Sequence, residues 1–399
     1  MPVFNPPITP IVKQTEVTFG YTDSQDWIDQ VSPNTNSWDC VAWSEELTLF
    51  AAGASTSAAD NFMNSSDGIT WNAFSVAGNP RMFSMIWVPE LGLYIACGQS
   101  VGVTGRIYTS PDGTTFTQRV NIGTIFFGAA WSPQLGIGVV VGSGLITQYT
   151  TDGIIWTTGT SAAAIGWRDV VWSPALGIFC SVGPTGANRV MTSTDGIAWT
   201  LQTASDVTKA WNGIAWSPSL GLFVAVASGG IMTSPDGVNW TNQTDPGTNT
   251  WSKVTWVADL GLFVACGNTA ASPGIITSPD GINWTSVTTP AHAWNGLSWS
   301  SSLGRLVVVG SNAVMTMDAL IVPEAERNFI IQDPDIRVDS NPVASLAYAQ
   351  PTGKDLDEIG MDALDIDAGC NIDKELTLNI KGLEGYLEGK FKINYTFQR

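Results

Sequence analysis

The sequence predicts an all-β protein whose seven four-stranded blades form a closed β-propeller, and three observations lead to this prediction. Variants of two phrases, Trp-Ser-Pro-x-Leu-Gly and Asp-Gly-x-x-aromatic, alternate along the chain, and no repeat contains a segment with the period of a helix. The N-terminal region supplies a strand that the last repeat lacks. The first phrase begins at Trp43, Trp87, Trp131, Trp172, Trp216, Trp256 and Trp299. These copies start about 40 to 44 residues apart, which is the period of a four-stranded blade.

Each repeat reads as four short strands, as its fifth copy illustrates. Trp211–Trp216 alternates, Leu222–Ala227 is apolar on both faces, and Ile231–Ser234 and Trp240–Gln243 complete the blade. A strand that is apolar on both faces is expected where blades stack on one another. Between the last two strands, Pro235–Gly237 has the chemistry of a tight turn, because Pro presets φ and Gly accepts a positive φ.

The ends of the repeat region predict how the ring closes. The second phrase ends at Trp71, Phe116, Trp156, Trp199, Trp240 and Trp284, and the seventh copy loses it after Met315–Asp318. Tyr21–Trp27 repeats its spacing from Asp to Trp, so an N-terminal strand should complete the last blade. We therefore expect an extended N-terminal arm at 1–18, the propeller at 19–318 and an acidic, β-rich C-terminal docking domain at 319–399.

Composition excludes several functions. The chain has 399 residues and a net charge of −18, so we expect it to bind neither nucleic acid nor anionic lipid. Its single His argues against a His-rich metal site and a Cys–His nucleophile pair. It contains neither an apolar run long enough to span a membrane nor an N-terminal signal pattern. Its five Cys lie mostly in apolar runs, which favours buried thiols and synthesis in a reducing cytoplasm.

The second phrase resembles the Asp-box (BNR, sialidase-type) repeats of β-propeller proteins. Ser110–Phe116, Ser193–Trp199, Ser234–Trp240 and Ser278–Trp284 carry the resemblance, although this box is one residue shorter than usual. The resemblance implies a structural turn on the rim away from the ligand face. That role falls to Asp67, Asp112, Asp152, Asp195, Asp236 and Asp280. The compact Ser-Pro-Asp-Gly-x-x-Trp-Thr form is similar to repeats of bacteriophage virion proteins.

Five of the 18 Trp belong to neither phrase and are the candidates for binding a ligand or partner. They are Trp38, Trp167, Trp211, Trp251 and Trp294, each five residues before the Trp of a first phrase. An odd offset places two strand residues on opposite faces, so these Trp should face away from the blade-packing Trp. With Arg168, Asn212 and Asn295 beside them, we expect a recognition surface at the mouth of the central channel. Packing between blades is the alternative interpretation.

Candidates for catalysis and for metal binding are few. The resemblance to sialidases would require an arginine cluster and a Tyr–Glu pair, and the repeats contain neither pattern. His292 is interpreted as an exposed loop residue. Asp365, Asp367, Asn371 and Asp373 have the spacing of a calcium loop but lack its final Glu, so we interpret them as a solvated acidic loop. We therefore expect no catalytic residue, no cofactor and no enzymatic activity.

The resulting functional expectation is a structural or recognition component of a bacteriophage particle, in the tail, baseplate or capsid surface. It would be made in the host cytoplasm and reside in the virion. Partners would be other virion proteins, contacted through the N-terminal arm and the C-terminal domain within an oligomeric assembly, or a host surface glycan or receptor. Unequal loops, such as Gly53–Asn61 against Gly142–Gly144, favour one-sided docking of a protein. The alternatives are a carbohydrate-binding or sialidase-like glycan-cleaving propeller and a cellular complex-assembly factor.

Overall fold

The protein divides into two compact units, Asp26–Ala319 and the combination of Met1–Gln25 with Leu320–Arg399. A computed structural model describes residues 27–318, except 57–58, 101–103, 187, 248 and 271–272, and the backbone of six short strands between residues 331 and 394. The expected arm at 1–18 and the first residues assigned to the propeller, 19–26, lie outside this description.

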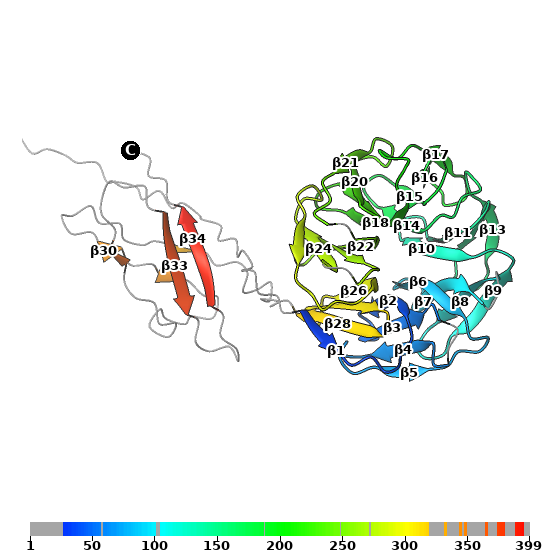
Figure 1. Cartoon of the computed structure of the whole chain (residues 1–399), viewed down its shortest axis with the longest axis horizontal. Coiled ribbons are helices and arrows are strands. Elements are labelled where there is room, and N and C mark those ends of the chain that lie inside the picture. Colours follow the sequence, from blue (N-terminus) through cyan, green and yellow to red (C-terminus); the bar gives the residue numbers. More distant parts are fainter. Residues whose placement is uncertain are drawn as a thin grey trace, which may run out of the picture. The chain divides into compact units, whose positions relative to one another are not determined.

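The larger unit is a seven-bladed β-propeller, which confirms the predicted fold class (Figure 1). Every blade is a four-stranded antiparallel sheet. The innermost strands are β2 (Trp38–Ser44), β6 (Arg81–Val88), β10 (Phe126–Ser132), β14 (Asp169–Ser173), β18 (Trp211–Ser217), β22 (Trp251–Val257) and β26 (Trp294–Ser300). The second strands are β3 (Leu49–Ala54), β7 (Leu93–Gln99), β11 (Ile137–Gly142), β15 (Ile178–Val182), β19 (Leu222–Ala227), β23 (Leu262–Gly267) and β27 (Arg305–Gly310).

The outer half of each blade is shorter and ends at the rim. The third strands are β4 (Phe62–Ser65), β8 (Gly105–Ser110), β12 (Ile146–Thr150), β16 (Val190–Ser193), β20 (Gly230–Ser234), β24 (Ile275–Ser278) and β28 (Ala313–Asp318). The outermost strands are β5 (Asn72–Phe74), β9 (Thr117–Ile122), β13 (Thr157–Thr160), β17 (Thr200–Gln202), β21 (Thr241–Gln243), β25 (Thr285–Val287) and β1 (Trp27–Gln30).

The N-terminal strand closes the ring, as the repeat count predicted. β1 pairs antiparallel with β28, so the last blade has the order β1-β28-β27-β26. Trp27 lies opposite Met317, and the side-chain amide of Gln30 donates to the hydroxyl of Thr316 at 2.8 Å. The last blade therefore consists of both ends of the propeller segment, and the edge of β28 is paired.

The hydrophobic core lies between the blades. Seven clusters of buried side chains fill the seven gaps between neighbouring sheets of the described ring. In the fifth blade, the rings of Trp216 and Phe223 lie 4.5 Å apart, and Phe223 lies 6.2 Å from Trp240. Phe223–Ala227 is fully buried, because both faces of its strand pack against another sheet.

The Asp-Gly phrases form turns between the third and fourth strands. In the fifth blade, Asp236 Oδ1 accepts from the backbone N–H of Val238 at 2.8 Å and of Asn239 at 2.7 Å. Ser234 Oγ accepts from the N–H of Gly237 at 2.8 Å. Six turns repeat this pattern around the ring, so their carboxylates are far apart and do not form one site. Burial opposes ionisation of Asp236, but these hydrogen bonds together lower its pKa to about 2.

The smaller unit contains three strand pairs. β29 (Ile331–Gln332) pairs with β31 (Ala347–Tyr348), β30 (Val343–Ala344) with β32 (Leu364–Asp365), and β33 (Asp373–Asn379) with β34 (Glu388–Asn394). The calcium-loop candidates Asp365, Asp367, Asn371 and Asp373 lie outside the residues whose side chains are described. Within the described parts of the chain, no helix is long and apolar enough to span a membrane.

Candidate functional site

A one-residue bulge near the start of the innermost strand creates the mouth of the central channel. The register between first and second strands shifts in six blades at this point, for example between Trp38 and Cys40 and between Trp211 and Gly213. The inserted residue is not matched with a partner on the second strand, so its side chain is released from the blade-packing pattern. We call the inserted residues, with Arg168 just before β14, the mouth ring: Asp39, Phe83, Phe127, Arg168, Asn212, Ser252 and Asn295.

The bulge corrects the prediction for the five extra tryptophans. Trp38, Trp167, Trp211, Trp251 and Trp294 are all 0% exposed, so none presents its ring to a partner at the surface. At Trp38, Trp211, Trp251 and Trp294 the bulge adds one residue, so an offset of five in sequence becomes an offset of four in the sheet; the fourth blade has no bulge, and Trp167 lies before its first strand. Trp38 lies opposite Ala54 and Trp43 opposite Phe50, so both indoles face the same gap between blades. The alternative interpretation, packing between blades, describes these five rings.

Four of these indoles also fasten the loop that enters their blade. Trp38 Nε1 donates to Ser32 Oγ at 3.1 Å, and Trp211 Nε1 donates to the carbonyl of Asp206 at 3.1 Å. Trp167 and Trp251 bond Ala163 and Asp245 in the same way. These buried indoles therefore fix the position of the backbone that carries the adjacent mouth-ring residues.

Polar members of the mouth ring form hydrogen bonds between consecutive blades. Asn212 donates to the carbonyl of Trp251 at 3.1 Å, Ser252 to the carbonyl of Trp294 at 2.9 Å, and Asn295 to the carbonyl of Trp38 at 3.3 Å. Each of these hydrogen bonds joins the start of one innermost strand to the start of the next. We expected Asn212 and Asn295 in a binding surface, and instead both side chains bond the neighbouring blade.

Asp39 is the acidic member of the mouth ring. Its Oδ1 accepts from Ser55 Oγ at 2.7 Å, from Asn295 Nδ2 at 3.0 Å and from Ser37 Oγ at 3.3 Å. Burial outweighs these hydrogen bonds and raises the pKa of Asp39 to about 6. The carboxyl group therefore changes its charge near neutral pH at the channel mouth.

The opposite side of the mouth is aromatic and cationic. The guanidinium carbon of Arg168 lies 4.2 Å from the ring centroid of Phe127, and Phe127 lies 5.5 Å from the ring of Phe83. All three side chains are partly exposed. Within the described residues, no hydrogen bond or ion pair engages the guanidinium of Arg168, and burial lowers its pKa. Its N–H groups are available to a ligand.

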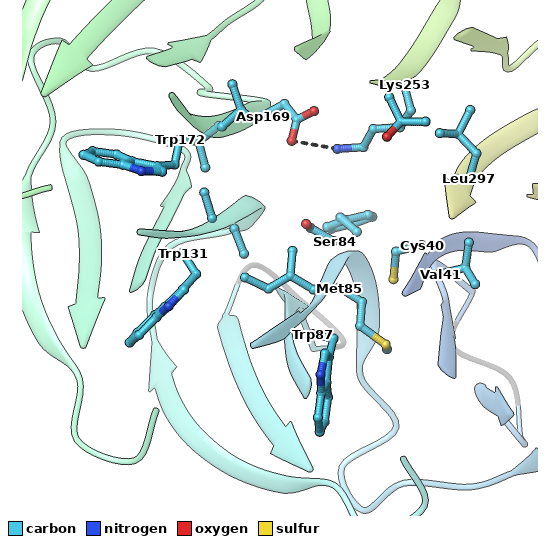
Figure 2. Close-up of a pocket in the computed structure, with 18 of the residues that line it drawn as sticks. Cys40, Val41, Ser84, Met85, Trp87, Trp131, Asp169, Trp172, Lys253 and Leu297 are labelled. Atoms are coloured by element: carbon cyan, nitrogen blue, oxygen red, sulfur yellow. Dashed lines mark ion pairs between the residues drawn. The ribbon is translucent and has the colours of Figure 1, made fainter. Parts of the chain in front are cut away.

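An ion pair lies in the channel below the mouth ring. Lys253 Nζ lies 3.0 Å from Asp169 Oδ1, and the two side chains are only 20% and 11% exposed (Figure 2). Asp169 Oδ2 also accepts from the N–H of Ile214 at 3.2 Å. The pair bridges the fourth and sixth blades and passes the fifth, where Gly213 has no side chain at the equivalent position. A Cβ on Gly213 would approach the Cα of Lys253 to 2.9 Å.

Sequence reasoning missed Asp169 and Lys253 because they are 84 positions apart and belong to different copies of the repeat. The available signal was the alignment of the copies at the position three residues before the Trp of the first phrase. That position holds Cys40, Ser84, Gly128, Asp169, Gly213, Lys253 and Gly296. Only two of these residues are charged, and their charges are opposite.

The channel is hollow. A cavity of about 490 Å³ runs along the innermost strands, with Phe83 and Asp39 at the mouth and Trp131 and Glu90 near the other end. The described residues contain no group of three or more His, Cys, Asp or Glu side chains that could hold a metal ion. Cys40, Cys97, Cys180 and Cys266 are buried free thiols whose pKa values are raised by burial.

His292 is partly exposed and lies on the loop before β26. Its Nε2 lies 3.3 Å from Asp29 Oδ2, and its ring meets the ring of Trp294 edge-on at 5.2 Å. It therefore contacts β1, the closing strand, and lies among blade residues. This geometry links His292 to ring closure.

The fold and channel define the class: a seven-bladed propeller with a ligand-sized central cavity. In structure, the chain is similar to streptogramin B lyase, with 11% identity, a TM-score of 0.61, and coverage of 73% of this chain and 97% of that one. It is also similar to virginiamycin B lyase from Staphylococcus aureus, with 8% identity, a TM-score of 0.61, and coverage of 74% and 99%. U3-55K matches with 11% identity, a TM-score of 0.56, and coverage of 74% and 99%. No known family and no curated sequence matches the chain.

These comparisons correct one expectation from the sequence. We expected a protein without enzymatic activity, yet the structures that share this fold include two lyases. The exclusion of catalysis was therefore wrong, because enzymes and non-enzymes both use the propeller. At these identities the likeness shows the fold alone.

Proposed function

We propose that this protein is a recognition propeller that binds a partner protein at the mouth of its channel. The partner would present a carboxylate beside an apolar side chain. The observation that carries this proposal is the guanidinium of Arg168, which stacks on Phe127 without a hydrogen-bond partner among the described residues. A propeller commonly serves as a scaffold for protein interactions, and this use agrees with such a mouth.

The geometry suits an acidic ligand because the ring of Phe127 positions the guanidinium of Arg168 and no acidic side chain of the described residues pairs with it. Stacking on an aromatic ring fixes the plane of a guanidinium and leaves its N–H groups free to bond a carboxylate in pairs. Phe83 extends the apolar floor beside it. Asp39, across the mouth, carries more negative charge above pH 6, so it would exclude a second acidic group from its own side.

The finer part of the proposal is that this recognition serves a bacteriophage particle. Its support is the resemblance of the Ser-Pro-Asp-Gly-x-x-Trp-Thr phrase to repeats of virion proteins, together with the two segments that flank the propeller. Mass spectrometry of purified particles from a strain that carries the gene tests it. The protein should be found in stoichiometric amount in the particles, and its absence from them would contradict this part alone.

Recognition at the mouth can be tested with an array of short peptides. Each peptide that pairs Glu or Asp with Leu or Phe is printed beside its Gln or Asn counterpart, and the array is probed with labelled full-length protein. We expect binding to the acidic member of a pair. Arg168→Gln should weaken that binding at least about tenfold, since a charge-assisted bidentate contact is lost. Arg119→Gln, on the outer strand β9 and bonded to Thr109, is the matched control and should bind normally.

Equal binding by Arg168→Gln and the parent protein would refute the proposed mouth site. A parallel array of glycans discriminates the carbohydrate alternative. Binding of sialylated glycans with no binding of acidic peptides would replace the proposed protein partner with a sugar.

A further inference from the structure

The end of the propeller opposite the mouth carries a second surface of unusual composition. We define the turn face as the thirteen turns that follow the innermost and the third strands. They comprise residues 45–48, 66–71, 89–92, 111–116, 133–136, 151–156, 174–177, 194–199, 218–221, 235–240, 258–261, 279–284 and 301–304. All of these residues are described by the structure. Antiparallel pairing within every blade places these turns at one end of the ring.

The charged residues within these turns have one sign, although Arg305, directly after the last turn, donates to the carbonyl of Asp67 and pairs with Asp318. The turns contain ten carboxylates and no Lys, Arg or His: Glu45, Glu46, Asp67, Glu90, Asp112, Asp152, Asp195, Asp236, Asp259 and Asp280. Hydrogen bonds from the turn backbone outweigh burial and lower the pKa of the Asp in the Asp-Gly turns, for example to about 2 in Asp280. The six Asp carboxylates of the Asp-Gly turns are therefore ionised throughout the physiological range.

Aliphatic side chains project among these carboxylates. Of the large hydrophobic residues that are exposed in the described chain, most lie on the turn face: Leu47, Ile69, Leu135, Ile154, Ile155, Leu176, Ile197, Leu220, Val238, Ile282 and Leu303. The leucines form an inner ring, and the Ile and Val residues that follow the Asp-Gly pairs form an outer ring. Ile154 is 53% exposed and Ile282 is 48% exposed.

The fold does not require aliphatic residues in the outer ring. At this position the backbone N–H donates to the Asp, and the second blade makes the same turn with Thr114, whose side chain also bonds Asp112. An exposed apolar side chain at five of six such positions is thus unexplained by the turn itself. Repeated apolar groups within a polar surround are typical of an interaction surface.

We infer that the turn face is a docking surface for a basic protein surface that also offers apolar contacts. Charge complementarity selects this occupant. A second turn face and the C-terminal segment 319–399, with fifteen acidic residues against eight basic ones, both have the same sign and would be repelled. Nucleic acid and anionic lipid are excluded for the same reason. The surface is independent of Arg168 and of the mouth.

The test measures binding of the full-length protein to three immobilised peptides of equal length. One alternates Lys and Leu, one alternates Lys and Ser, and one alternates Glu and Leu. The inference predicts the tightest binding to the Lys-Leu peptide, weaker binding to Lys-Ser, and none to Glu-Leu. The binding should also weaken as salt rises, since the charges on this face are exposed.

Two sets of variants locate the surface. Ile154→Thr, Ile197→Thr and Ile282→Thr together copy the natural Thr114 and should weaken binding to the Lys-Leu peptide at least about tenfold. Leu145→Thr with Val207→Thr changes exposed aliphatic residues outside the turn face, which are 49% and 40% exposed, and should leave binding unchanged. Circular dichroism and thermal melting establish that each variant is folded.

Three results would overturn the inference. They are equal binding of the Lys-Leu peptide by the triple variant, equal binding of Lys-Leu and Lys-Ser by the parent protein, and a hydrogen-exchange footprint of the bound peptide at the mouth ring instead of the turns. Protection confined to the turns would support it. Arg168→Gln leaves the turn face unaltered, and the Ile→Thr variants leave the mouth unaltered. The two sets of variants therefore distinguish failure of the mouth proposal from failure of this inference.

Discussion

The ion pair in the channel allows a quantitative prediction. Replacing Lys253 with Met leaves Asp169 ionised with one backbone partner, and replacing Asp169 with Asn leaves the ammonium unpaired. At 3.0 Å the attraction between the charges is about 5 to 6 kcal/mol for an effective dielectric constant near 20. Desolvation offsets most of this attraction in the intact protein. Loss of one partner, however, leaves the other charge desolvated without compensation.

We therefore expect each single substitution to lower the free energy of unfolding by about 3 kcal/mol, the low end of the range for buried pairs, because both side chains retain some exposure. The double variant should lose less than the sum, with a coupling of about 2 kcal/mol. Urea unfolding followed by tryptophan fluorescence measures all four proteins. Because the pair is nearly buried, 0.5 M salt should change the coupling little.

The exposed pair of Asp29 and His292 provides the matched control. Its side chains are 47% and 36% exposed, so the cycle of Asp29→Asn and His292→Gln should give a coupling below about 1 kcal/mol that falls with salt. If the Asp169–Lys253 cycle were additive within about 0.5 kcal/mol, or as salt-sensitive as the control, the pair would not hold the fourth and sixth blades together.

Three further predictions follow from the same geometry. Gly213→Ala should destabilise the fold by about 2 kcal/mol, because its Cβ would lie 2.9 Å from the Cα of Lys253. Gly123→Ala, with no atom within 4 Å of the added Cβ, is the control and should be neutral in the same urea experiment. Equal effects of the two substitutions would contradict the steric argument. Asp39 binds its proton more tightly in the folded state, with a pKa of about 6 against 3.8, so its contribution to stability is present below pH 4 and is lost as pH rises to 6. The stability of Asp39→Asn relative to the parent protein should therefore increase across that interval, and a constant difference would refute the assignment. Finally, Ellman's reagent should label at most Cys370 in the native protein and all five thiols after unfolding, since the other four are buried; rapid labelling of two native thiols would contradict this.

The fold was readable because every blade repeats its own turn chemistry. Seven copies of the Trp phrase and six of the Asp-Gly phrase specify the strands, and the spacing at Tyr21–Trp27 anticipated the closing strand. The mouth was not readable in the same way. A bulge is one additional backbone residue. Because residues as different as Asp39, Phe83 and Asn212 occupy this position, no residue type in the sequence predicts it. Because the bulge was not anticipated, counting along the strand assigned Trp38, Trp211, Trp251 and Trp294 to the wrong face.

The contacts inside the channel also could not be predicted from the pattern of any one repeat. Asp169 and Lys253 meet only because the ring places the innermost strands of the fourth and sixth blades on either side of the fifth, around one channel. Arg168 was singled out for its place beside Trp167, but its significance comes from stacking on Phe127 of the preceding blade. Such contacts depend on the curvature of the ring, which local sequence does not encode.

The closing strand has a consequence for biosynthesis. A ribosome makes β1 first and β28 last among the propeller strands, so the hydrogen bond from Gln30 to Thr316 joins residues 286 positions apart. Until synthesis reaches β28, the nascent chain holds an incomplete ring whose first strand has no partner. Contacts this distant in sequence slow folding and prolong the exposure of unpaired edges. We expect ribosome-bound chains that stop before β28 to be sensitive to protease and to recruit chaperones, and chains whose β28 has left the ribosome to become resistant.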